Sequence, residues 1–197
     1  MIVDQLKNYY RKLVYFKAGV AYIHVPKCGG TSVSTSLYGR RLGHLTYDEI
    51  RLISPNVALC TIIRDPIERF VSAYKFASVG ASDGIYLGPK IETLEECLEY
   101  IKYTDEVELD PVFRTQSFYL GGILDDKNMG FIGILSSKNA MDYFREKYKI
   151  EVLNLNRSNC MNVELDGKFQ EKISDLYKGD VVLFQQILDQ GGFISGV

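Results

Sequence analysis

The sequence predicts an α/β fold in three layers, with helices on both faces of a mainly parallel central sheet. Short apolar runs alternate with segments of helical periodicity along the chain. One run, residues 57–63, is almost wholly apolar, which is typical of a strand buried on both faces of a parallel sheet. The 197 residues, 46% hydrophobic and 24% charged, are sufficient for one self-supporting core. We therefore expect a single domain over residues 1–197.

The first elements follow from spacing. A helix is expected over residues 4–16, where apolar side chains recur at helical spacing. Residues 20–25 form a compact strand, which continues through a glycine-rich turn into a helix at 33–38. The strand at 57–63 leads into a helix at 66–77. This order places two strand-to-helix junctions in the first 77 residues.

The rest of the chain continues the alternation. Residues 80–90 are glycine-rich and predict a loop, and Thr93 is a suitable N-cap for a helix at 94–102 with Glu96 at its third position. The further expected elements are helices at 111–120 and 139–148, one or two helices within 169–188, and strands at 130–135 and 151–155.

The cysteines and the hydropathy of the chain indicate the compartment in which we expect the protein. Four widely spaced cysteines form no CxxC pair, and with two histidines the chain offers no His-rich metal cluster, so no metal site is expected. Free cysteines favour a reducing compartment, and we expect a cytoplasmic protein. No window approaches the roughly 20 apolar residues of a membrane span, and the N-terminus does not resemble a secretory signal.

Charge is distributed unevenly. The net charge of −2 argues against a general nucleic-acid binder. Residues 1–75 carry 11 Lys and Arg against 5 Asp and Glu, a local charge of +6, whereas residues 76–197 carry 12 against 20, a local charge of −8. An anion site is therefore expected in the first third. The acidic stretch at 91–110 is either a solvated helix face and loop or a surface that selects substrates.

The first motif lies between the strand at 20–25 and its following helix. Glycines allow backbone N–H groups to approach an anion, the helix start adds unpaired donors, and a lysine adds a point charge. Because the lysine precedes the glycines, the motif differs from the Walker A pattern GxxxxGK[ST]. The residues predicted to hold a phosphate-like group are Lys27, Cys28, Gly29, Gly30, Thr31 and Ser32.

The second motif begins where the strand at 57–63 ends. Arg64 leaves that strand at the carboxyl edge of the sheet, and its planar guanidinium suits bidentate phosphate contact. Ser72, two helical turns into the next helix, is a second candidate for the same phosphate. Asp65 is expected to cap that helix, with Pro66 at its first position. Arg69 is expected to be a surface or ion-pair residue.

Together the two motifs resemble sulfotransferases that use 3′-phosphoadenosine 5′-phosphosulfate (PAPS), in particular the glycan-type branch related to heparan and chondroitin sulfotransferases. The resemblance covers about residues 20–77 and implies a P-loop-like fold with PAPS as cosubstrate and no metal. It implies that residues 27–32 hold the 5′-phosphosulfate, and that Arg64 and Ser72 hold the 3′-phosphate. Weaker similarities to this family occur at residues 114–116, 119–122 and 131–133. The resemblance also implies that Arg157 and Ser158 belong to a late basic loop that closes over the nucleotide.

A sulfuryl acceptor must lose its hydroxyl proton, and a histidine can accept it near neutral pH. His44 follows the first motif's helix, and glycan-type relatives resemble this chain in carrying a histidine there, so His44 is the expected base. His24 is expected to be a core or cofactor-edge histidine. Glu49 and Asp48 remain alternative bases.

The sequence thus predicts an enzyme that transfers a sulfuryl group from PAPS to an acceptor hydroxyl. The resemblance favours a glycan acceptor, which we expect an insertion at residues 80–120 to contact, while residues 20–77 form the cosubstrate-binding core. An ATP-dependent kinase and a nucleotide-binding protein without transferase activity are the alternatives that the sequence leaves open.

Overall fold

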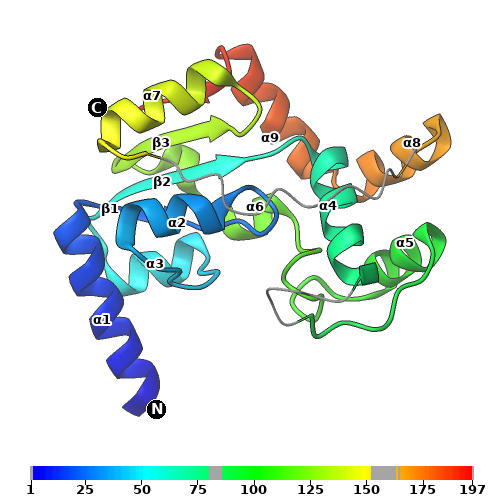
Figure 1. Cartoon of the computed structure of the whole chain (residues 1–197), viewed down its shortest axis with the longest axis horizontal. Coiled ribbons are helices and arrows are strands. Elements are labelled where there is room, and N and C mark those ends of the chain that lie inside the picture. Colours follow the sequence, from blue (N-terminus) through cyan, green and yellow to red (C-terminus); the bar gives the residue numbers. More distant parts are fainter. Residues whose placement is uncertain (1, 80–85, 152–162, 164, 197) are drawn as a thin grey trace.

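A computed structural model describes residues 2–79, 86–151, 163 and 165–196. Its strands form one sheet in the order β1-β2-β3-β4, in which the first three strands are parallel and β4 is antiparallel to β3 (Figure 1). The predicted α/β class with a mainly parallel sheet is confirmed. The strands are β1 (Val20–Ile23), β2 (Ala58–Ile63), β3 (Met129–Ile134) and β4 (Phe193–Ile194).

Helices occupy most of the connections between strands. Those before β2 are α1 (Ile2–Ala18), α2 (Gly30–Tyr38) and α3 (Tyr47–Ile53). Between β2 and β3 lie α4 (Pro66–Val79), α5 (Leu94–Tyr103), α6 (Gln116–Leu120) and the 3₁₀ turn η1 (Ile123–Asp125). The last helices are α7 (Lys138–Tyr148), α8 (Gly167–Leu176) and α9 (Lys178–Asp189).

Side-chain alternation along the strands builds a core on each face of the sheet. Ala21 and Ile23 of β1 pack with residues of α1, α3, α6 and α9, whereas Val20 and Tyr22 pack with α2 and α7. The same alternation separates the neighbouring β2 residues Leu59 and Cys60. Helices therefore cover both faces, and the three-layer arrangement follows.

A third apolar cluster lies beyond the end of the sheet. It joins α4, α5 and α8 to the segment at 109–113, and these elements gather at one end of the molecule (Figure 1). Phe113 and Tyr177 are fully buried within it. This cluster fixes the position of α4, which carries part of the candidate site.

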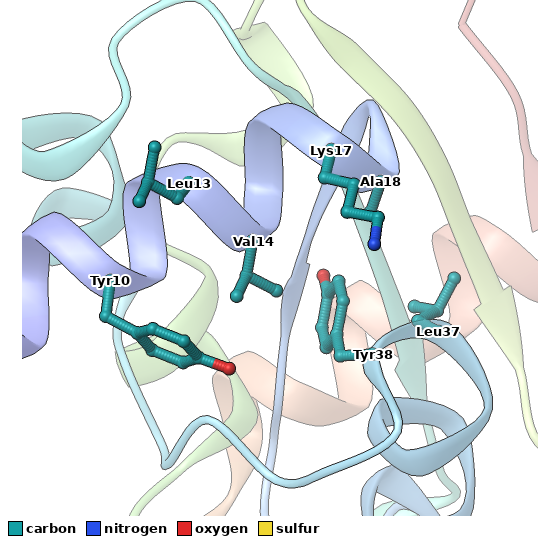
Figure 2. Close-up of a pocket in the computed structure, with 7 residues that line it drawn as sticks. All are labelled: Tyr10, Leu13, Val14, Lys17, Ala18, Leu37 and Tyr38. Atoms are coloured by element: carbon teal, nitrogen blue, oxygen red, sulfur yellow. The ribbon is translucent and has the colours of Figure 1, made fainter.

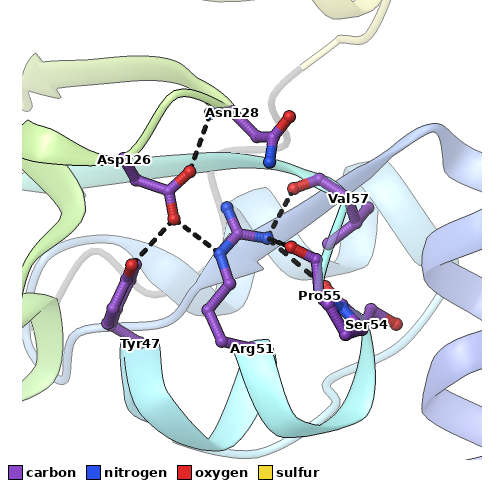
Figure 3. Close-up of polar contacts among 7 residues, drawn as sticks. All are labelled: Tyr47, Arg51, Ser54, Pro55, Val57, Asp126 and Asn128. Carbon is purple, nitrogen blue, oxygen red and sulfur yellow. Dashed lines mark hydrogen bonds and ion pairs between the residues drawn. The ribbon is translucent and has the colours of Figure 1, made fainter.

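A polar network holds α3 against the loop that enters β3 (Figure 3). The Arg51 guanidinium donates from Nε to Asp126 Oδ2 at 2.6 Å and from Nη1 to the carbonyl of Val57 at 2.8 Å. The Tyr47 hydroxyl donates to the same carboxylate at 2.8 Å. Although desolvation opposes ionisation, the donors from Arg51, the Asn128 amide and Tyr47 together lower the pKa of Asp126.

A tyrosine protects the exposed edge of β1. The Tyr38 hydroxyl donates to the carbonyl of Val20 at 3.1 Å and accepts from the amide of Tyr22 at 2.8 Å. One side chain thereby satisfies two backbone groups that an edge strand leaves unpaired.

Several element boundaries depart from the sequence prediction. The expected helix at 111–120 is confined to α6, because the preceding carbonyls bind side chains instead of helical N–H groups. The segment 169–188 contains parts of two helices, α8 and α9, and neither α3 nor β4 was predicted. The expected strand at 151–155 lies almost wholly outside the described residues. None of the helices in the described part of the chain is long and apolar enough to cross a membrane.

Candidate anion-binding site

The loop between β1 and α2 has an unusual backbone. Lys27 adopts a left-handed conformation with φ of 66°, which is rare for a residue with a β-carbon. Gly29, at φ of 74°, is the N-cap of α2 and has no side chain to accept from the first helical turn. The starts of α3, α5, α6, α7 and α8, by contrast, are each capped by a threonine, serine or aspartate. The Gly29 N-cap therefore offers no side chain to the first turn of α2, where the Ser32 amide donates to the Gly29 carbonyl at 3.1 Å, and such a helix start suits an anion.

His24 explains why α2 begins with glycine. A β-carbon on Gly30 would lie 1.9 Å from Cδ2 of the His24 ring and 2.3 Å from its Nε2. The ring therefore occupies the space beside the Gly30 α-carbon. Burial lowers the pKa of His24 well below its ordinary value, with further lowering by His44 and Arg41, so the ring is neutral.

The Lys27 ammonium lies in a partly buried, positively charged environment. Its Nζ is 4.4 Å from the centre of the Phe76 ring, on α4. Desolvation lowers the pKa of Lys27, and the charges of Arg64 and Arg69 lower it further. Cations of the second motif thus repel the Lys27 ammonium, and an anion beside it would relieve this repulsion.

Gln116 joins the two motifs. Its Oε1 accepts from the Cys28 thiol at 3.3 Å and from the Arg64 amide at 2.9 Å, while its Nε2 donates to the Arg64 carbonyl at 2.9 Å. The side chain is fully buried. One amide group therefore sets the separation between the end of β2 and the loop at residues 24–29, here called the Lys27 loop. The sequence drew attention to residues 114–116 only through resemblance and gave Gln116 no such role.

The expectation that Arg69 is a surface or ion-pair residue is wrong. Arg69 is 1% exposed and donates to three carbonyls, from Nε to Pro26 at 3.0 Å and from Nη2 to Val112 and Arg114 at 3.2 and 2.6 Å. It thereby fixes the residue preceding Lys27 against the segment that leads to Gln116. Its partners are 43 to 45 residues away in sequence, so no local pattern could identify them.

Asp180 of α9 holds the backbone at Gln116 and Ser117, and the sequence did not identify it. Its carboxylate accepts from the amides of Gln116 and Ser117 at 2.7 and 2.8 Å and from the Ser117 hydroxyl at 2.9 Å. Burial raises the pKa of Asp180, whereas the Arg69 charge and these donors oppose the increase. The buried carboxylate thus offsets the charge of the buried arginine.

Arg64 lies just before α4 and Ser72 lies within the helix, with the acid Glu68 between them along the chain. The Arg64 guanidinium donates from Nε to Glu68 Oε2 at 3.1 Å, and Ser72 follows Glu68 by one helical turn on the same face. Arg64 is partly exposed, with 28% of its side chain accessible. The Asp65 carboxylate accepts from the Glu68 amide at 2.9 Å, which confirms the predicted N-cap.

His44, in the loop after α2, packs against the His24 ring with the two ring planes tilted by 51°. Their ring centres are 4.2 Å apart, and His44 Nδ1 is 2.9 Å from the His24 carbonyl. A carbonyl only accepts, so Nδ1 carries the proton and Nε2 of neutral His44 has the free lone pair. Desolvation by the surrounding atoms lowers the pKa of His44 although the residue is exposed, while the carbonyl contact and Asp110 oppose the decrease. The arrangement gives a neutral imidazole with one orientated basic nitrogen.

The remaining candidates occupy varied positions. Glu49, one alternative base, accepts from the Thr46 amide in a capping box at the start of α3, and Asp48 lies exposed in the same turn. Thr31 is partly exposed in the first turn of α2, and the adjacent Ser32 is buried. The predicted contacts Arg157 and Ser158 lie outside the described residues.

One hollow lined by described residues lies away from this site. It has a volume of about 530 Å³ and is bounded by α1 and the C-terminal end of α2 (Figure 2). None of the motif residues lines it. The residues of the two motifs instead lie around the start of α2, at the carboxyl end of the parallel strands, which is the edge at which open α/β sheets bind ligands.

Comparison with known proteins adds no assignment. No protein-family model matches the sequence, and no curated protein matches it significantly.

Proposed function

We propose that this protein is a PAPS-dependent sulfotransferase that transfers the sulfuryl group to an acceptor hydroxyl. The observation that carries the proposal is the Gln116 side chain, which binds both the Lys27 loop and the backbone of Arg64. It brings together two cationic segments that the sequence separates by more than 30 residues. Two adjacent anion sites suit a nucleotide with phosphate groups at its 5′ and 3′ positions.

The proposed contacts follow from the local chemistry. The uncapped N–H donors of α2 and the Lys27 ammonium would hold the 5′-phosphosulfate, and Arg64 with Ser72 would hold the 3′-phosphate. Glu68 competes for the Arg64 guanidinium, so binding of the 3′-phosphate requires that this ion pair open or share its donors. The resemblance to glycan-type enzymes extends the proposal to a P-loop-like fold.

The chemical step is an in-line displacement at sulfur. The acceptor oxygen forms a new bond to sulfur while the bond from sulfur to the bridging phosphate oxygen breaks. His44 Nε2 accepts the hydroxyl proton, and adenosine 3′,5′-bisphosphate leaves with the bonding electron pair. Lys27 and the loop amides stabilise the negative charge that develops on the leaving oxygen.

The acceptor would approach from the segment that precedes α6. The Asp110 carboxylate, which accepts from the amides of Leu87 and Val112 at 2.8 and 3.0 Å, is close enough to His44 to affect its pKa. We propose a saccharide hydroxyl as acceptor, on the family resemblance.

The buried free thiols of Cys28, Cys60 and Cys97 are consistent with a reducing compartment such as the cytoplasm.

Isothermal titration calorimetry with adenosine 3′,5′-bisphosphate and with adenosine 5′-phosphate tests the nucleotide assignment. We expect much tighter binding of the first compound, because only it carries the 3′-phosphate. Arg64→Ala should reduce the ratio of the two affinities at least tenfold, since a charge-assisted contact contributes about 1.5–3 kcal/mol. Glu68→Gln should strengthen the preference, because it frees the Arg64 guanidinium.

Arg145→Ala provides the matched control, because Arg145 also pairs with a carboxylate on an exposed helix face. It should leave both affinities unchanged. Equal binding of the two nucleotides by the wild-type protein would refute the 3′-phosphate site.

A kinase remains the second candidate, because the Lys27 loop also suits ATP phosphates. Binding of ATP and of PAPS should be compared with magnesium and with EDTA. A sulfotransferase should bind and turn over PAPS in EDTA. ATP-dependent phosphorylation that requires magnesium, without PAPS turnover, would favour the kinase.

A further inference from the structure

Helix α1 directs its apolar side chains away from the core. Phe16 is 85% exposed and Leu6 is 64% exposed, and Leu13 and Tyr9 are similarly accessible. At 100° per residue these four side chains fall within one narrow stripe of the helix surface. The helix projects from one end of the sheet, with its N-terminal half extending beyond the other elements (Figure 1).

The opposite side of α1 attaches it to the fold. Tyr15 is buried in the core under the sheet, and Arg11 donates from Nε to the carbonyl of Leu42 at 3.2 Å. These contacts fix the rotation of the helix, so the apolar stripe cannot turn inward without breaking them. The exposed stripe is therefore a property of the folded protein.

The hollow beside α1 extends this apolar surface. Tyr10 and Leu13 belong both to the outer face of the helix and to the lining of the hollow, which continues to Leu37 and Tyr38 of α2 (Figure 2). The Lys17 side chain reaches over it. The apolar surface thus spans two helices.

Cations surround the stripe. Helix α1 carries Lys7, Arg11, Lys12 and Lys17 against the single acid Asp4, a net charge of +3. Lys7 and Lys12 lie on the two sides of the stripe, and the Arg40 guanidinium lies 5.5 Å from the centre of the Tyr10 ring. This combination of an apolar stripe and flanking basic residues is typical of helices that lie in a membrane interface.

We propose that α1 docks this protein on the surface of a bilayer that contains anionic lipids. The stripe would enter the boundary between headgroups and acyl chains, and the flanking lysines would contact the lipid phosphates. A second copy of the chain fits less well, because pairing through α1 would place one +3 helix against another. This docking does not depend on the proposed sulfuryl transfer.

Co-sedimentation of the full chain with large unilamellar vesicles tests the proposal. Wild-type protein should bind vesicles of phosphatidylcholine with about 30% phosphatidylserine at least tenfold more strongly than phosphatidylcholine alone, and less strongly at high salt. Leu6→Gln combined with Leu13→Gln should weaken this binding at least tenfold. Lys7→Gln combined with Lys12→Gln should weaken it on the order of tenfold and reduce its salt dependence.

The matched control is Val182→Gln combined with Leu188→Gln, because these exposed apolar residues lie on α9, far from α1 (Figure 1). It should bind as the wild-type protein does. Circular dichroism should show unchanged helix content in each variant, and the lysine pair provides an independent test if the leucine pair perturbs folding.

Absence of binding to the anionic vesicles at low salt would overturn the proposal, as would equal loss of binding in the α9 control. A wild-type dimer in sedimentation velocity that the leucine variant converts to monomer, without vesicle binding, would assign the stripe to self-association instead.

Discussion

At the scale of single residues, the contact between Gly30 and the His24 ring makes the site intolerant of a methyl group. Alanine at position 30 would place its β-carbon 1.9 Å from a ring carbon, so either the ring or the start of α2 must move. We expect Gly30→Ala to lower the free energy of unfolding by roughly 1–3 kcal/mol and to abolish nucleotide binding. Thermal unfolding and calorimetry measure the two effects.

Gly167→Ala is the control, since Gly167 also begins a helix and a β-carbon there meets nothing within 4 Å. It should be neutral or slightly stabilising, because alanine favours helix. If Gly30→Ala binds nucleotide as the wild-type protein does, the start of α2 is not the binding site.

The orientation of His44 leads to a prediction about pH. Because desolvation lowers its pKa, neutral His44 should predominate at pH 7, and kcat should decline only as pH falls below the ordinary histidine pKa of about 6.5. His44→Ala should reduce kcat by about 10²–10⁴ while PAPS affinity stays nearly constant. A pH–rate profile and a PAPS titration of both proteins provide the measurements.

Two other results would reassign His44. Loss of PAPS binding in His44→Ala would make it a structural or nucleotide-binding residue. A wild-type kcat in that variant would point to the alternative bases Asp48 and Glu49, of which Glu49 already accepts from the Thr46 amide at the start of α3.

At the scale of elements, Gln116 couples the end of β2 to the loop before α2. Gln116→Ala would remove three hydrogen bonds and leave the partly buried Arg64 backbone groups without these partners, which should cost about 2–4 kcal/mol of stability. Affinity for adenosine 3′,5′-bisphosphate should fall as well, because the two cationic segments would no longer be held at a fixed separation. Chemical denaturation and calorimetry report both changes.

Gln170→Ala serves as the comparison, because the exposed Gln170 side chain donates to one carbonyl, that of Leu165. It should alter stability by less than about 0.5 kcal/mol. Nucleotide affinity that survives Gln116→Ala would show that the two segments bind independently.

The sequence predicted the elements whose patterns are local. The apolar runs identified β1, β2 and β3, and Asp65 and Thr93 identified the starts of α4 and α5. It missed α3, which is seven residues long, and β4, which is two, because neither is long enough to show a period.

Within the candidate site, the sequence could predict residues that share a motif but not residues that meet through the fold. Lys27 and Arg64 each follow a predicted apolar strand, so a local pattern is enough to identify them. Arg69 and Asp180 act through partners at least 43 residues away, so their roles depend on tertiary contacts that spacing does not encode. Helical periodicity likewise predicted α1 but could not show which of its faces meets the core.

At the scale of the whole molecule, the Arg51 and Asp126 network connects α3 to the entrance of β3. Asp126→Asn should lower the free energy of unfolding by roughly 2–4 kcal/mol at pH 7, because it leaves the Arg51 charge without its partner. The pKa of Asp126 is lowered in the folded protein, so its contribution is present above the ordinary carboxyl pKa and is lost as pH falls through the folded value.

Melting temperatures at pH 7 and pH 3 check this prediction, since the difference between wild type and variant should narrow at acid pH. Asp142→Asn, which removes an exposed ion pair with Arg145, should change little at either pH. A constant difference at both pH values would show that the Asp126 charge is not responsible.

The left-handed backbone of Lys27 has a consequence for attempts to engineer this protein. Glycine adopts that conformation without steric cost, so Lys27→Gly should be more stable than Lys27→Ala by about 1 kcal/mol, although both lack the ammonium group. A library of variants selected for heat resistance alone would therefore enrich glycine at position 27. The most heat-resistant clones would be among those that had discarded the charge on which anion binding depends.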